Sequence, residues 1–120
     1  MDLKIESKEN YLLVTLEGRV SLYEAITVYT RACDVTAQRG FSKILVDGSS
    51  ADGKLSIFQR YELGRTMAQY CQSRFMSPKV ATVGTPPTID GFGALVARNR
   101  GMVAETFPDL QTAQAWLNQI

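Results

Sequence analysis

Three aspartates occupy positions where carboxylates could transfer protons or hold a divalent cation. Asp47 closes a short apolar run, Asp52 follows in a glycine-rich stretch, and Asp90 comes after the next apolar run. Carboxylates at one sheet edge can bind Mg²⁺ or act as general acids and bases. However, an aspartate at a strand end or in a first helical turn commonly binds backbone N–H groups. We therefore expect structural roles for all three, with metal-assisted catalysis as the third-ranked hypothesis.

A second chemical motif lies at residues 48–54, which match the G-x-x-x-x-G-K pattern of a phosphate-binding loop. The match fails in two respects. Leu55 occupies the position where a hydroxyl would bind Mg²⁺, and Asp52 would place a negative charge among phosphates. The sequence therefore predicts a glycine-rich turn with positive φ, and no nucleotide or other cofactor.

The nucleophiles lack the base that usually activates them, because the chain contains no histidine. This absence removes Ser–His and Cys–His catalysis and most zinc sites. Cys33 and Cys71 each fall on the apolar side of a predicted helix, which favours buried, unpaired thiols over a disulfide or redox pair. The sequence therefore favours a protein that is not an enzyme.

The elements that position these residues follow from periodicity and capping. Residues 2–7 and 11–17 predict a β-hairpin. Ser21 with Glu24 and Ser56 with Gln59 form capping boxes, and each opens a long stretch of helical periodicity. The first helix is expected to end at Gly40 and the second at Ser77-Pro78. Between them we predict a buried strand at residues 43–46 and a loop at residues 48–55, and place the second helix's apolar stripe at Ile57, Tyr61, Gly64, Ala68, Cys71 and Phe75.

The second half of the chain continues the alternation. We predict a strand at residues 79–84, a break at 85–87, a helix at 88–100, a strand at 103–107 and a terminal helix capped by Asp109. The order ββαβαβαβα indicates one α/β domain, residues 1–120, with a mostly parallel sheet, an N-terminal antiparallel hairpin and packed helices. Function is expected at the carboxyl ends of the strands, in residues 47–56 and 84–91.

Net charge and hydropathy indicate which kinds of partner and which location to expect. The formal net charge is only +1, which argues against nucleic acid as a partner. No apolar run is long enough for a transmembrane segment, and the charged N-terminus does not resemble a secretory signal, so we expect a cytoplasmic protein. Oligomeric state stays open, a homodimer included.

Two groups of side chains have both a structural and a functional interpretation. The aromatic and methionine residues could line a pocket for an apolar ligand, although core packing explains them more simply. They are Tyr29, Phe58, Tyr61, Met67, Tyr70, Phe92 and Trp116. The arginines of the second and third helices could form a basic surface, although a solvated face is the simpler interpretation. They are Arg60, Arg65, Arg74, Arg98 and Arg100.

With this order of elements, the chain resembles the SpoIIAA-like family, whose fold is shared by STAS domains and, more distantly, by CRAL/TRIO lipid-binding domains. The resemblance spans nearly the whole chain and is strongest with the small stand-alone branch. It rests on residues 43–48, 60–64, 79–92, 99–101 and 107–117. It implies a bacterial, non-enzymatic regulatory module that binds a protein. The lipid-binding relatives imply an alternative, a small apolar or lipid-like ligand.

The resemblance also implies a candidate phosphorylation site at Ser56, which matches the regulatory serine of the family. Leu55 replaces the aspartate that precedes that serine, and Ile57-Phe58 replaces a small pair after it. A role as helix N-cap explains Ser56 without phosphorylation. The residues expected to contact a protein partner or a ligand are Asp47, Ser49, Ser50, Asp52, Ser56, Arg60 and Asp90.

Overall fold

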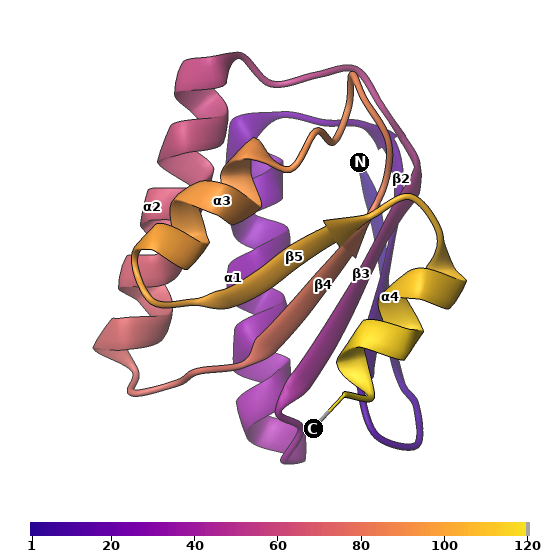
Figure 1. Ribbon diagram of the computed structural model, residues 1–120, viewed down its shortest axis with the longest axis vertical. Coiled ribbons are helices and arrows are strands. Elements are labelled where there is room, and N and C mark those ends of the chain that lie inside the picture. The colour runs from indigo at the N-terminus through magenta and orange to yellow at the C-terminus, as the bar shows by residue number, and fades with distance from the viewer. Residues whose placement is uncertain (120) are drawn as a thin grey trace.

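The chain, for which a computed structural model describes residues 1–119, folds into one five-stranded sheet with helices on both faces (Figure 1). The strands are β1 (Asp2–Ser7), β2 (Leu12–Arg19), β3 (Lys43–Asp52), β4 (Lys79–Val83) and β5 (Val103–Phe107). The helices are α1 (Leu22–Arg39), α2 (Ile57–Ser73), α3 (Phe92–Asn99) and α4 (Leu110–Leu117). This order confirms the predicted ββαβαβαβα pattern.

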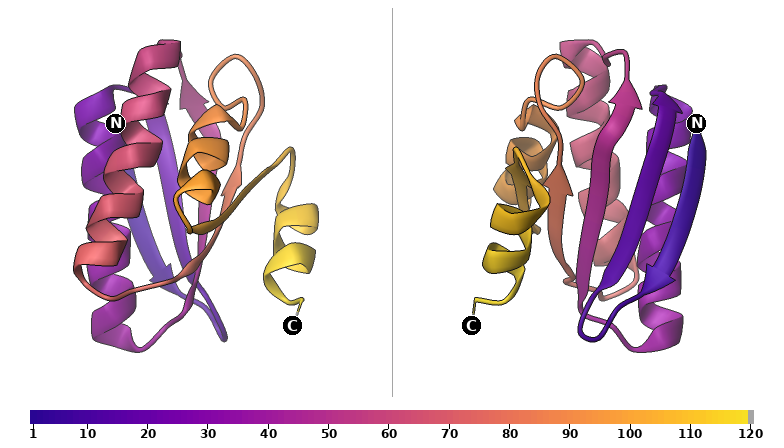
Figure 2. Two further views of the ribbon diagram at one scale, coloured as in Figure 1. Left: turned by 60° about the vertical axis from the view of Figure 1, so that its left-hand side comes forward. Right: turned by 90° about the vertical axis from the view of Figure 1, so that its right-hand side faces the viewer.

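The sheet follows chain order, β1-β2-β3-β4-β5, with an antiparallel β1–β2 hairpin and parallel pairing from β2 onward. Right-handed crossovers that always step in the same direction place their helices on one face. α1, α2 and α3 accordingly cover one face, and α4 alone covers the other (Figure 2). Within residues 1–119 no helix is long and apolar enough to cross a membrane.

Two cores hold the layers together, one on each face of the sheet. Alternation along β3 directs Ile44 and Val46 into the core under the three helices and Leu45 into the core under α4. All three are almost fully buried, which confirms the prediction of a strand buried on both faces. The smaller core consists of Leu45, Ala81, Val83, Ala113 and Leu117.

The helix boundaries follow the predicted caps. Ser21 accepts a hydrogen bond from the Glu24 backbone, and Asp109 accepts one from the Thr112 backbone. Gly40 closes α1 at a φ of 75°. Side-chain caps supply acceptors for the N–H groups that a first helical turn leaves free.

The predicted loop at residues 48–55 is wrong for most of its length, because β3 continues to Asp52. After a bulge between Thr15 and Glu17, residues 17–19 of β2 pair with residues 50–52. The G-x-x-x-x-G-K stretch is thus mostly extended strand. In it only Gly53 has the positive φ expected of a turn, 78°.

The second and third helices are shorter than predicted. α2 ends at Ser73, and the chain turns at Phe75, whose φ is 55°. α3 begins only at Phe92, after Gly91 at a φ of 89°. The buried stripe of α2 is Gly64, Met67, Ala68 and Cys71. Its predicted outer members lie beyond the core, where Ile57 is 71% exposed and Phe75 98% exposed.

The two cysteines are buried and free, as the sequence predicts. Their sulfurs lie 3.5 Å apart and share a hydrogen bond between α1 and α2. This hydrogen bond and burial raise the pKa of the Cys33 thiol, which therefore stays protonated. A buried protonated thiol packs as a small hydrophobe.

Glycine allows two close approaches that position the helices. A Cβ on Gly64 of α2 would lie 2.5 Å from the Gly93 carbonyl oxygen and 2.8 Å from the Val96 Cβ of α3. A Cβ on Gly84 would lie 2.4 Å from Cδ1 of Ile89 and 2.9 Å from its Cβ. The first glycine lets α2 touch α3, and the second lets the loop after β4 fold back onto the sheet.

The two outer strands of the sheet, β1 and β5, carry charged side chains. Asp2, Lys4 and Glu6 alternate along β1. Beside β5, Arg98 donates a hydrogen bond to the Ala104 carbonyl at 2.9 Å and pairs with Glu105. The Glu105 carboxylate also accepts a hydrogen bond from the Thr106 backbone N–H. Side chains thus occupy backbone groups of β5.

Candidate functional site

An ion pair joins the start of α2 to the loop after β4. The Arg60 guanidinium donates to the Asp90 carboxylate at 2.8 Å and to the Pro87 carbonyl at 2.8 Å. The Arg60 side chain is only 13% exposed, so the pair is partly shielded from solvent. It forms because both segments lie at the carboxyl ends of the parallel strands. Among the hydrogen bonds and ion pairs of residues 1–119, it is the one between two of the seven predicted site residues that joins separate elements.

Asp90 differs from its predicted place in a first helical turn. It precedes the N-cap Gly91, and its carboxylate accepts a hydrogen bond from the Phe92 backbone N–H at 3.0 Å. One carboxylate therefore serves both α3 and Arg60. Asp90 supports the start of the helix from outside it.

The predicted site residues on β3 are close in sequence, and the hydrogen bonds that join them are local to that strand. The Asp47 carboxylate accepts hydrogen bonds from the Ser49 hydroxyl at 2.7 Å and from its backbone N–H at 3.1 Å. Ser50 and Asp52 are exposed on the part of β3 that pairs with β2 alone. Within residues 1–119, no group of three acidic, cysteine or histidine side chains could hold a metal ion.

Ser56 forms both halves of the predicted capping box. Its hydroxyl accepts from the Gln59 backbone at 3.1 Å, and the Gln59 side chain accepts from the Ser56 backbone at 2.9 Å. Ser56 is exposed, and the next two residues, Ile57 and Phe58, are each 71% exposed. Tyr61, one turn later, is 36% exposed. We call Ile57, Phe58 and Tyr61 the α2 apolar patch.

The α2 apolar patch was missed by the sequence prediction, which assigned Phe58 and Tyr61 to the core or a pocket. Phe58 falls outside the apolar stripe of α2, and this offset is the signal that could have revealed the patch.

The predicted basic surface is largely neutralised by ion pairs. Arg65 pairs with Glu62, Arg74 with Asp34, and Arg98 with Glu105. Arg100 donates to the Tyr61 hydroxyl at 2.9 Å.

Several solved structures are similar to this chain over nearly its full length. An anti-sigma factor antagonist from Mycobacterium paratuberculosis superposes with a TM-score of 0.66 at 13% identity, covering 98% of this chain and 94% of that one. The anti-sigma factor antagonist SpoIIAA in its unphosphorylated form gives 0.53 at 9% identity, covering 99% and 100%. This chain has a SpoIIAA-like fold.

A third SpoIIAA-like structure comes from an uncharacterised protein of the DUF3478 family from Shewanella loihica. It gives a TM-score of 0.51 at 17% identity and covers 97% of this chain and 92% of that one. No family model matches the sequence, and no curated protein matches it. At these identities the likenesses establish the SpoIIAA-like fold alone.

Ser56 is expected to stabilise the SpoIIAA-like fold as an N-cap. Ser56→Ala should lose about 1 kcal/mol of unfolding free energy, because the Gln59 N–H loses its acceptor. Ser56→Asp should stay near wild type, since aspartate caps well and its charge suits the helix N-terminus. Urea unfolding measures both. Ser50→Ala, a change at an exposed serine of β3, is the control, and equal stability of Ser56→Ala and Ser50→Ala would contradict the cap.

Proposed function

We propose that this chain is a regulatory module without catalytic activity that binds another protein through the α2 apolar patch. The exposure of Ile57 and Phe58 carries the proposal. Folding normally buries large apolar side chains that neighbour each other, and those left on the surface mark binding sites. These two lie on the first turn of α2, and Tyr61 extends the patch by one turn.

The geometry around the patch supports a defined docking surface. The capping box fixes the first turn of α2, and the Arg60 ion pair holds that turn to the loop after β4. Arg100 lies over the Tyr61 ring at 5.3 Å and bonds its hydroxyl. Apolar groups on a rigid element lose little entropy on binding. The partner is therefore expected to present an apolar cavity or groove.

The compared structures are consistent with this proposal. Two of them are named anti-sigma factor antagonists, and that name describes proteins that act on another protein. We propose a regulatory protein as the partner here. The predicted residues Ser49, Ser50, Asp52 and Ser56 lie at the end of β3 and the start of α2, so they would form the polar rim of the same surface.

The experiment is affinity purification from the source organism with three baits: wild type, Phe58→Ser and Phe75→Ser. Phe75 is the matched control, because it is 98% exposed and follows the opposite end of α2. A partner should be captured by wild type and Phe75→Ser and lost with Phe58→Ser. The purified partner should then show at least about a tenfold weaker affinity for Phe58→Ser, as expected of a central aromatic contact.

Two results would overturn this proposal. Equal recovery of every captured protein with Phe58→Ser and Phe75→Ser would show that the patch is not the docking surface. A wild-type homodimer that Phe58→Ser converts to a monomer would show that the patch joins two copies of this chain. Ser56→Asp tests phosphorylation in the same assay: weaker partner binding with unchanged folding is expected if a charge at Ser56 controls docking.

A further inference from the structure

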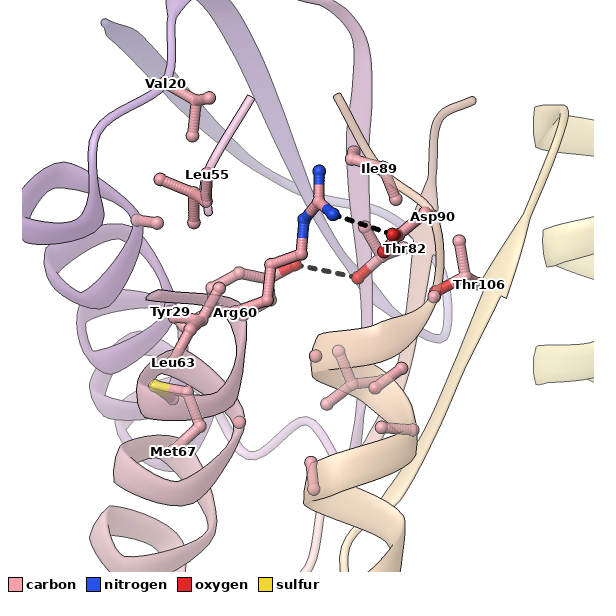
Figure 3. A pocket seen from close by; sticks show the side chains of 18 of the residues that line it. Val20, Tyr29, Leu55, Arg60, Leu63, Met67, Thr82, Ile89, Asp90 and Thr106 are labelled. Carbon is pink, nitrogen blue, oxygen red and sulfur yellow. Dashed lines mark hydrogen bonds and ion pairs between the residues drawn. The ribbon is translucent and has the colours of Figure 1, made fainter. Parts of the chain in front are cut away.

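A cavity of about 130 Å³ lies between the sheet and the three helices that cover its first face. Its walls are mostly apolar and include Leu16, Leu55, Leu63, Met67, Val80 and Ile89. Figure 3 labels four of these residues, Leu55, Leu63, Met67 and Ile89, and shows the Arg60 side chain extending from α2 toward Asp90. An apolar cavity of about 150 Å³ is known to hold one benzene molecule. The volume therefore suits a compact compound and excludes a lipid with two acyl chains.

The charged side chains among the lining residues, Arg60 and Asp90, already neutralise each other, and the N-terminal ammonium of Met1, which also lines the cavity, pairs with Glu24 at 2.7 Å. Arg60 also has the Pro87 carbonyl as an acceptor. A charged ligand would have to compete with Arg60 or Asp90 for its existing partner, whereas a neutral ligand leaves the pair intact. The cavity therefore favours a neutral ligand.

The cavity also contains one hydrogen-bonding site built from neutral groups. The Tyr29 hydroxyl from α1 and the Thr82 hydroxyl from β4 lie 2.8 Å apart, as the dashed line in Figure 3 marks. The two hydroxyls carry two protons, and their mutual hydrogen bond uses one. Within residues 1–119 neither hydroxyl has a further protein partner. Burial raises the pKa of Tyr29, so the phenol keeps its proton.

We propose that this cavity binds a neutral, compact, largely apolar compound with one hydroxyl or carbonyl oxygen. The oxygen accepts the free proton of the Tyr29–Thr82 pair, and the apolar body fills the space under α2. Thr106, the β5 neighbour of Thr82 in the sheet register, adds a further hydroxyl to the lining. A donor left without an acceptor in an apolar site is unfavourable, and the ligand oxygen removes that penalty. This site is separate from the α2 apolar patch.

The test uses benzyl alcohol, toluene and benzoate as probes of similar size, with binding followed by calorimetry and methyl NMR on the full chain. Benzyl alcohol should bind the wild type, and benzoate should bind at least about tenfold more weakly. Tyr29→Phe removes the hydroxyl and keeps the ring. This substitution should lower the affinity for benzyl alcohol about tenfold and leave the affinity for toluene unchanged. Tyr70→Phe is the control, because Tyr70 bonds Asp34 outside the cavity.

A second measurement needs no variant. Benzyl alcohol should shift the methyl signals of Met67 and Val80, which line the cavity, and leave Leu117 on the other face unmoved. Absence of binding at millimolar benzyl alcohol would overturn the proposal, and so would benzoate binding as tightly. Equal effects of Tyr29→Phe and Tyr70→Phe, or equal shifts on both faces of the sheet, would overturn it as well.

Discussion

Gly64→Ala is expected to lower the free energy of unfolding by about 1–3 kcal/mol. In an exposed helix the same change would stabilise the protein by about 1 kcal/mol, because alanine is the better helix former. At Gly64 the new Cβ would lie 2.5 Å from a backbone oxygen of α3, and a backbone atom cannot rotate away. The two helices must therefore separate.

The matched control for Gly64 is Gly93→Ala, on the opposite side of the same contact. A Cβ there would meet only the Arg60 carbonyl oxygen at 3.5 Å, an ordinary contact distance. Gly93→Ala should therefore keep or slightly raise stability. Chemical denaturation of both variants measures the difference, and equal values for the two would show that α2 and α3 are not packed through Gly64.

Gly84→Ala is the second change with a large expected effect, again a loss of about 1–3 kcal/mol. The added Cβ would lie 2.4–3.0 Å from three carbon atoms of Ile89, and one of them, the Ile89 Cβ, is fixed to the backbone. The loop after β4 must then move off the sheet. Since this loop contains Asp90, the Arg60 ion pair should weaken as well.

A double-mutant cycle isolates the contact between Gly84 and Ile89. In an Ile89→Ala background, Gly84→Ala should cost at least about 1 kcal/mol less than it does alone. Ile89→Val removes only the terminal carbon, Cδ1. It should therefore rescue Gly48→Ala, whose Cβ would meet that carbon at 2.6 Å, more fully than Gly84→Ala. Additive losses in every pair would mean that Ile89 packs elsewhere.

The helices and most strands could be predicted because local chemistry specifies them. Ser21, Ser56 and Asp109 supply caps, and alternation marks the buried strands. The extension of β3 to Asp52 could not be predicted, because residues 49–52 carry no apolar alternation and become strand only by pairing with residues 17–19 of β2. Tertiary pairing overrides local preference there.

The contacts among the candidate site residues could not be predicted from the sequence. The rule that function lies at the carboxyl ends of parallel strands selected residues 47–56 and 84–91, which include Asp90, whereas Arg60 was considered as one of the arginines of the second helix. The ion pair between Arg60 and Asp90 spans thirty residues of sequence and depends on where α2 lies over the sheet. The cavity depends on the spacing between layers, which no periodicity encodes. The α2 apolar patch could not be predicted, because the sequence alone does not distinguish exposed from buried apolar residues near the start of a helix.

The charged side chains on the two outer strands affect whether the protein aggregates at high concentration. A sheet margin with open N–H and C=O groups can recruit another chain and propagate into fibres. On the β5 side, Arg98 and Glu105 already occupy the Ala104 carbonyl and the Thr106 N–H. On the β1 side, a strand from another chain would have to pack beside the charged side chains of Asp2, Lys4 and Glu6. Concentrated protein should therefore resist amyloid-type polymerisation.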